Sequence, residues 1–309
     1  MSPHFARRGN EHEHEHDLGL AHDLRTMVSR RRALYLFGAA GTGAFAAACS
    51  ATDSPDSAAS ASAIETASSN ISAIPQETAG PYPGDGSNGP NVLIESGVAR
   101  SDITTSFGSY SGVAQGVPTK IQLDLRDLAR SGAAGAGMAV YLWHCDRAGK
   151  YSLYSDGVTD QNYLRGVQVA DTSGAVAFTS IFPACYDGRW PHIHFEVYDS
   201  LESAVAGENA RLTSQIALPR DVCESVYAYD SGYSASTSNI SRVTLASDNV
   251  FGDGWDAELA TISGTPATGL TVSLTVGVAA KSENVQSGNG FRPPPGGGGP
   301  PPGGRPPGR

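Results

Sequence analysis

The chain has 309 residues and a formal net charge of −10 at pH 7. An acidic surface repels phosphate backbones and anionic lipid headgroups, so nucleic acid and anionic membrane surfaces are excluded as the main partners. Once the low-complexity segments at both ends are set aside, the length leaves room for one domain with a sizeable core.

Residues 1–49 combine a polar N-terminal extension with an export signal. Three arginines at positions 30–32 precede a mildly apolar stretch, 34–48, which is too short and too rich in glycine to span a bilayer. The adjacent arginines resemble a twin-arginine signal. The sequence Ala-Ala-Ala-Cys ending at Cys49 resembles a lipoprotein cleavage site, with release of a soluble protein as the alternative. We expect an extracellular or cell-envelope protein, and any membrane attachment through a lipid on Cys49.

The segments on either side of the domain have little to bury. Residues 50–72 are rich in Ala, Ser and Thr and predict a flexible tether. Residues 288–309 are mostly Gly and Pro and predict a disordered tail. The predicted domain is therefore residues 73–287.

Within this domain, Gly and Pro interrupt short runs rich in Val, Ile, Thr, Tyr and Phe, and no long stretch has helical periodicity. This pattern predicts an all-β domain, most simply a β-sandwich. The expected strands are residues 120–125, 138–143, 175–178, 192–198, 242–245 and 270–278.

The strand at 192–198 carries the clearest chemical signal. Period two places His192 and His194 on one face of it, about 7 Å apart along the strand. The only other histidine downstream of the leader is His144. Two imidazoles so placed can bind one metal ion, although zinc, copper and iron sites on unrelated β folds all use such a pair. Two partly exposed strand histidines without a metal are the alternative.

Other motifs surround this strand in a characteristic order. They are Glu77-Thr-Ala-Gly-Pro-Tyr-Pro, Trp143-His-Cys-Asp-Arg-Ala-Gly-Lys-Tyr-Ser, Asn162-Tyr-Leu-Arg-Gly-Val-Gln and Thr213-Ser-Gln. Over about residues 75–223 they resemble the intradiol ring-cleavage dioxygenases, the family of catechol 1,2-dioxygenase and protocatechuate 3,4-dioxygenase, and especially its secreted single-chain branch. The resemblance implies a prealbumin-like antiparallel β-sandwich whose long loops carry a metal site.

The resemblance also implies a non-haem Fe(III) cofactor and its ligands. By position in the motifs, the ligands are Tyr151, Tyr186, His192 and His194. Phenolate is a hard anionic donor suited to ferric iron, and imidazole binds iron as well. Tyr154 is the alternative to the first tyrosine, and His144 is expected to have a structural role.

The implied reaction cleaves the ring of catechol-type diols between the two hydroxylated carbons with O2 and gives cis,cis-muconate-type products. In it Tyr186 leaves the iron and acts as a base, and Arg189 stabilises negative charge on the substrate. Gln215 and Tyr82 are expected beside the substrate. The identity of the catechol and the oligomeric state stay open.

Two other functions also stay open. His144 together with His192 and His194 would make a three-histidine zinc or copper enzyme. A surface-anchored, non-catalytic binding module would keep the prealbumin-like fold with a degenerate site. The domain has three cysteines, which allow at most one disulfide with undecided partners: Cys145, Cys185 and Cys223.

Overall fold

The structure is a computed structural model that describes residues 71–281 of the chain. The predicted export signal and C-terminal tail lie outside the described residues, as does the predicted tether apart from its last two residues. The described range covers nearly all of the predicted domain.

Nine strands form two sheets in this range. The five-stranded sheet has the order β2-β1-β9-β8, with β5 also paired to β1. Its strands are β1 (Pro118–Asp127), β2 (Ala133–Ala134), β5 (Ala175–Ile181), β8 (Thr261–Thr265) and β9 (Gly269–Val278). The four-stranded sheet has the order β4-β3-β6-β7 and is antiparallel throughout. Its strands are β3 (Ala139–Trp143), β4 (Arg165–Val169), β6 (His192–Tyr198) and β7 (Leu212–Ala217).

One hydrophobic core contains side chains from both sheets. Strand β1 alternates as the sequence predicts, with Ile121, Leu123 and Leu125 buried and the intervening polar residues more exposed. By contrast, β3 and β6 are buried at every position. Segments outside the sheet cover their second face, as where the Tyr141 hydroxyl donates to the carbonyl oxygen of Pro83 at 2.6 Å.

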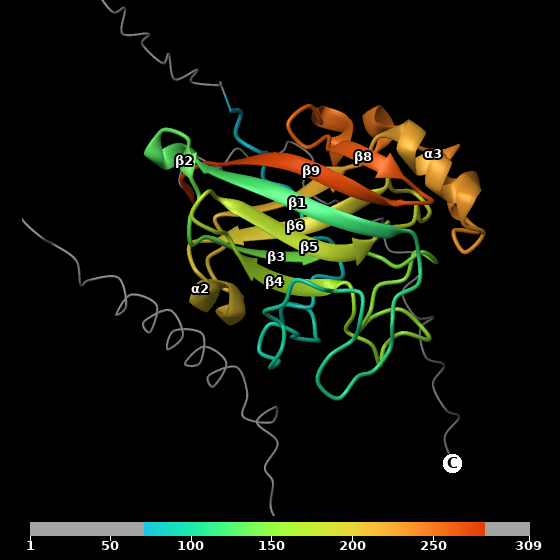
Figure 1. Cartoon of the computed structure of the whole chain (residues 1–309), viewed down its shortest axis with the longest axis horizontal. Coiled ribbons are helices and arrows are strands. Elements are labelled where there is room, and N and C mark those ends of the chain that lie inside the picture. The colour runs from blue at the N-terminus through green and yellow to red at the C-terminus, as the bar shows by residue number, and fades with distance from the viewer. Residues whose placement is uncertain (1–70, 282–309) are drawn as a thin grey trace, which may run out of the picture.

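The remaining elements are short helices. They are η2 (Leu128–Arg130), α2 (Leu201–Ala206), α3 (Arg220–Tyr229), α4 (Ser236–Ile240), η3 (Leu245–Ser247) and η4 (Phe251–Asp253). In Figure 1, α3 lies at one end of the sheets and α2 near the other. The domain is therefore mostly β with few helices, which confirms the predicted fold class in its coarse form.

Two details of the prediction are wrong. Residues 242–245 form no strand, and Leu245 instead begins η3. The Thr244 hydroxyl accepts a hydrogen bond from the backbone of Ser247, and the Ser247 hydroxyl accepts one from the backbone of Thr244. This capping box starts a helical turn, whereas β-branched Val243 and Thr244 favoured a strand.

The second wrong detail is strand direction. Strands β1 and β9 pair in parallel, with Ile121 opposite Val272, whereas the prediction was antiparallel. Parallel neighbours need a long crossover, and here most of the domain connects the two strands. A strand pattern carries no information about a partner so far away in the chain.

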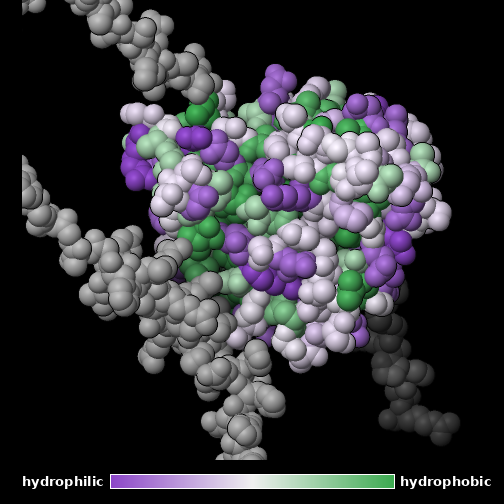
Figure 2. Space-filling view, viewed as in Figure 1, coloured by the Kyte–Doolittle hydropathy of each residue, from purple (hydrophilic) through white to green (hydrophobic). Residues whose placement is uncertain are grey.

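The visible face in Figure 2 is mainly polar, with apolar residues in scattered patches. Large apolar side chains that are exposed in the described range are isolated from one another in sequence: Ile94, Val113, Tyr229 and Leu259. Among residues 71–281, no helix has both the length and the apolar content needed to cross a membrane.

Candidate metal centre

Strand β6 places two histidines on one face of the four-stranded sheet. His192 and His194 are each 2% exposed, and their Nε2 atoms lie 3.1 Å apart. The strand is paired on both sides, because His194 lies opposite Trp143 on β3 and opposite Gln215 on β7. Alternation predicts a separation of about 7 Å along the strand. The rings turn toward each other, so their nitrogens converge.

Tyr151 follows β3 after a tight turn. The carboxylate of Asp146 accepts hydrogen bonds from two backbone N–H groups of this turn, at 2.8 and 2.9 Å. Gly149 has a φ of +81°, and a Cβ there would lie 3.0 Å from Cβ of Tyr186. Glycine at this position therefore allows the two tyrosine-bearing loops to approach each other.

Tyr186 lies in the loop between β5 and β6. The thiol of Cys185 donates to the carbonyl oxygen of Arg189 at 3.5 Å, and the Asn239 amide donates to the carbonyl oxygen of Cys185 at 2.7 Å. These contacts hold the loop on both sides of Tyr186. The structure contains no disulfide within residues 71–281, and its three cysteines are buried free thiols: Cys145, Cys185 and Cys223.

The side chains of the four predicted ligands meet around one point. Nε2 of His192 lies 3.1 Å from the Tyr186 hydroxyl, 3.4 Å from the Tyr151 hydroxyl and 3.1 Å from Nε2 of His194. Donors that share one first-row metal ion at about 2.0–2.1 Å lie about 3 Å apart, so the cluster fits a single ion. Two phenols and two imidazoles form a donor set that suits ferric iron.

Burial determines the protonation of the two histidines. It lowers the pKa of both well below the ordinary 6.5, because a buried imidazolium loses its hydration. Nδ1 of His192 lies 2.5 Å from the carbonyl oxygen of Trp190, which can only accept a hydrogen bond. The proton of His192 is therefore on Nδ1, and Nε2 offers its lone pair to the cluster.

Burial also acts on the two phenols. It raises the pKa of Tyr151 well above 10.0, and it raises that of Tyr186 to about 12 although the positive charge of Arg189 opposes the rise. Both hydroxyls are protonated at neutral pH unless a cation displaces the protons. Binding of a metal at this cluster would therefore release protons from the tyrosines.

The alternative ligands have other partners. The Tyr154 hydroxyl donates to the side-chain oxygen of Asn88 at 2.7 Å. His144 uses both ring nitrogens elsewhere, with Nδ1 2.8 Å from the carbonyl oxygen of Cys145 and Nε2 2.7 Å from the hydroxyl of Ser180. The three-histidine site is not formed. In the described part of the chain, no group of three or more His, Cys, Asp or Glu is arranged to hold a metal ion.

Arg189 is fixed beside the cluster by a chain of hydrogen bonds. Its Nε donates to Asp248 at 2.9 Å, and its Nη2 donates to the side-chain oxygen of Gln215 at 2.7 Å. The Gln215 amide in turn donates to the carbonyl oxygen of Thr78 at 2.9 Å. Asp248 is 2% exposed and also accepts from the backbone of Trp190. The structure thus brings Arg189 and Gln215, both predicted beside the substrate, into direct contact.

Tyr82 lies over the first ligand, with its ring centroid 5.0 Å from that of Tyr151. Buried Arg165 fastens this arrangement by donating to the carbonyl oxygens of Tyr82, Pro83 and Ser152 at 3.0, 2.8 and 3.0 Å. One guanidinium therefore joins the segment that carries Tyr82 to the segment that carries Tyr151.

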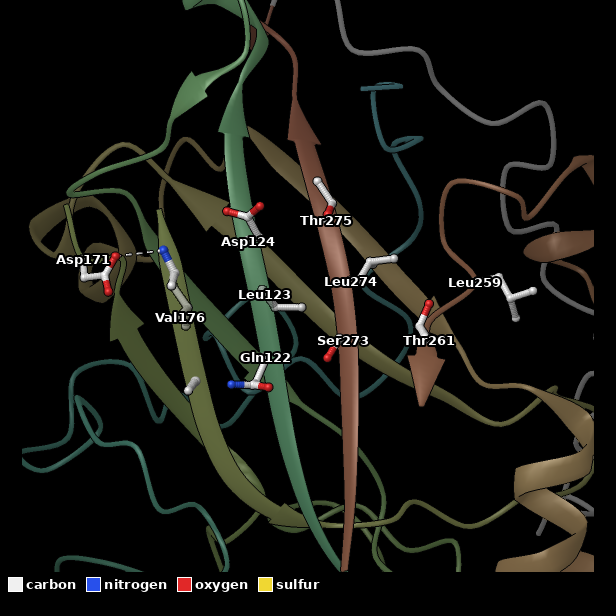
Figure 3. Close-up of a pocket in the computed structure, with 12 residues that line it drawn as sticks. Gln122, Leu123, Asp124, Asp171, Val176, Leu259, Thr261, Ser273, Leu274 and Thr275 are labelled. Carbon is white, nitrogen blue, oxygen red and sulfur yellow. Dashed lines mark hydrogen bonds between the residues drawn. The ribbon is translucent and has the colours of Figure 1, made fainter. Parts of the chain in front are cut away.

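A groove of about 520 Å³ lies elsewhere, on the outer face of the five-stranded sheet (Figure 3). Gln122, Asp124 and Ser273 point into it from β1 and β9. Its acidic groups already have partners, because Asp124 pairs with Arg126 at 2.7 Å and Asp171 accepts from a backbone N–H at 3.0 Å. None of the predicted site residues lines it.

Sequence reasoning missed three residues that hold the cluster in place. Asp248 lies 59 positions from Arg189, and nothing in the sequence links the two. Arg165 and Trp143 were recognised only as parts of motifs. The burial of these two residues cannot be read from the sequence. Once it is known, burial is informative for Arg165 alone, because a buried arginine requires several hydrogen-bond acceptors.

Comparisons with known proteins agree with the motifs. Residues 99–249 match the model of the dioxygenase family. An intradiol ring-cleavage dioxygenase from Tetranychus urticae aligns with a TM-score of 0.53 at 24% identity, over 67% of this chain and 95% of that one. A second dioxygenase structure aligns with a TM-score of 0.53 at 25% identity, over 68% and 95%. Hydroxyquinol 1,2-dioxygenase from Pseudomonas putida DLL-E4 aligns with a TM-score of 0.43 at 16% identity, over 68% of each chain.

No curated protein sequence matches the chain. In its mostly-β fold and over residues 99–249, the protein is therefore similar to dioxygenases. The matched family model and the structural neighbours agree with the resemblance of the motifs to the intradiol ring-cleavage dioxygenases.

Proposed function

We propose that this protein is an exported Fe(III)-dependent intradiol dioxygenase that cleaves catechol-type diols with O2 to cis,cis-muconate-type products. The observation that carries the proposal is the convergence of the Tyr151, Tyr186, His192 and His194 donor atoms. The match to the dioxygenase family model supports ring cleavage, and with it an aromatic diol and O2 as substrates. The iron and the products are inferred from the donor set and the motifs.

The two tyrosines and two histidines would hold the iron. Ferric iron bound there would draw electron density from a coordinated catechol and make its ring reactive toward O2. Tyr151 is 1% exposed, whereas Tyr186 is only partly buried. Tyr186 therefore has more room to move aside for a substrate oxygen. Its raised pKa makes its phenolate a strong base, suited to accept a proton from the incoming catechol.

Arg189 would stabilise the negative charge that builds up on the substrate. Its side chain is 14% exposed, and its guanidinium is held by Asp248 and Gln215 before any substrate binds. A donor fixed in advance needs no reorganisation during the reaction, which is the condition for efficient electrostatic stabilisation. Tyr82, packed on Tyr151, would form a wall of the substrate pocket.

Oxygen uptake tests this function. Iron-loaded protein should consume O2 with at least one of catechol, protocatechuate, hydroxyquinol and lignin-derived diols, and it should absorb visible light through tyrosinate-to-iron charge transfer. Iron-loaded protein that consumes no O2 with any of them would point to the non-catalytic binding module. Colourless protein that retains zinc and rejects iron would refute the cofactor.

Two further parts of the proposal concern fold and location. We propose that the two sheets pack as a prealbumin-like sandwich, which the core shared by both sheets supports. Export through a twin-arginine signal, followed either by lipidation of Cys49 or by release of a soluble protein, rests on the sequence of residues 1–49 alone.

A further inference from the structure

The two histidines of the cluster are held in different ways. His192 donates from Nδ1 to the carbonyl oxygen of Trp190, which fixes its ring. For His194, no group among residues 71–281 forms a hydrogen bond with Nδ1, although that atom is buried. Metal-binding histidines almost always use the second nitrogen in such a bond, and the bond sets the orientation of the ring. Among the described residues, the ring of His194 is therefore oriented by another contact.

That contact is the indole of Trp143. The two rings are stacked, with centroids 4.9 Å apart and an angle of 4° between their planes. Trp143 is fully buried and also stacks against Tyr141, whose hydroxyl donates to the carbonyl oxygen of Pro83 at 2.6 Å. At the edge of the imidazole, a Cβ on Gly80 would lie 3.2 Å from Cε1 of His194.

We infer that Trp143 is a positioning residue that orients His194 for metal binding by stacking, in the role that a backbone carbonyl plays for His192. The inference rests on the proposed function, because it requires a metal at the cluster. Trp143 and His194 are directly opposite each other on β3 and β6, so the sheet register itself brings the two rings together. A flat, immobile indole restricts rotation of the imidazole, and a ring oriented in advance loses less freedom when it binds.

Three buried variants separate positioning from simple core filling. Trp143→Phe keeps a planar ring that can stack on His194. Trp143→Met keeps an apolar side chain at this position but has no planar ring. Phe178→Met is the matched control, because Phe178 is 1% exposed and lies on β5 in the other sheet. The measurements are thermal stability and the iron affinity of the metal-free protein, determined by competition with a chelator.

Both methionine variants should lose stability, but only Trp143→Met should lose iron affinity, by about 10- to 100-fold as for other groups that orient a metal ligand. Trp143→Phe should stay within about threefold of the wild type, because a stacked ring remains. Wild-type affinity in Trp143→Met, or an equal loss in Phe178→Met, would overturn the inference and leave the proposed function intact. A wild-type protein that binds no iron would contradict both the inference about Trp143 and the proposed function.

If Trp143→Met does not fold, the crystal structure of metal-free Trp143→Phe tests whether stacking orients His194. The imidazole of His194 should lie parallel to the new phenyl ring. An imidazole that has left the phenyl face while iron affinity is unchanged would show that stacking does not position it.

Discussion

Replacement of Glu258 by Gln should abolish a loss of stability that the wild-type protein suffers as the pH rises. The side chain of Glu258 is fully buried, and its Oε1 accepts a hydrogen bond from the Ser214 hydroxyl at 3.1 Å. Burial raises the pKa of Glu258 from 4.5 to about 8, and the nearby negative charge of Glu77 adds to the rise. The folded protein therefore keeps a proton on Glu258 at neutral pH.

The sign of the effect follows from the direction of this shift. Between pH 4.5 and about 8, the folded state holds a proton that the unfolded state releases, so the free energy of unfolding falls as the pH rises. The contribution is complete below pH 4.5 and is lost as the pH passes through the folded pKa. At about 1.4 kcal/mol for each pKa unit, the total loss is roughly 3–5 kcal/mol.

Glu258→Gln has the shape of the protonated acid and retains an acceptor for Ser214. Its free energy of unfolding should match the wild type below pH 4.5 and exceed it increasingly up to about pH 8. The assay is urea unfolding over this range. Buried histidines also titrate over this pH range. Their contribution to the free energy of unfolding cancels in the difference between the two proteins. Exposed Glu202→Gln is the control for removal of one carboxylate. Parallel pH curves for the wild type and Glu258→Gln would refute the reasoning.

Further predictions concern the metal, the substrate and export. His194→Ala and Tyr151→Phe should each lose bound iron and visible absorption, measured by metal analysis and spectroscopy; a coloured, active variant of either would mean that the ligands are misassigned. Arg189→Ala should keep iron and colour, because a guanidinium has no lone pair for a metal. Its kcat should fall by about 10²–10³-fold, and wild-type turnover would place the arginine outside the substrate pocket. Asp248→Asn should lower kcat less than Arg189→Ala does, because a neutral amide still accepts one hydrogen bond. Replacing the arginine pair within residues 30–32 by lysines should leave the protein in the cytoplasm, and unchanged export on cell fractionation would contradict the twin-arginine route.

Local patterns in the sequence were sufficient for much of the sheet structure. Alternation predicted β1, and the run of apolar residues ending at Trp143 predicted β3. Strand β7 was missed because Ser214 and Gln215 interrupt its apolar pattern. Both are fully buried in the structure, where they bond to Glu258 and Arg189. Their partners lie far away in the chain, so no local pattern identifies them as strand residues.

The sequence by itself determined the residue types of the candidate site. The His192–His194 alternation is local, and the order of the motifs around it carries the resemblance to the intradiol dioxygenases. The motifs pointed to Tyr151 with Tyr154 as the alternative, and in the tertiary structure Tyr151 reaches His192 whereas the hydroxyl of Tyr154 is bonded to Asn88. Three positions separate these tyrosines, and the turn geometry at Gly149 and the packing of loops decide between them.

The tertiary structure also decided how the site is supported. Asp248 reaches Arg189 across 59 positions, and Trp143 meets His194 through the register of β3 and β6. Contacts of this kind depend on which strands pair and how loops fold over them, and many residues at either position would satisfy the local pattern. Local sequence thus specifies the donors, because period and spacing act over a few residues. Their orientation arises from long-range packing, because it takes several distant segments to hold each ring and guanidinium in place.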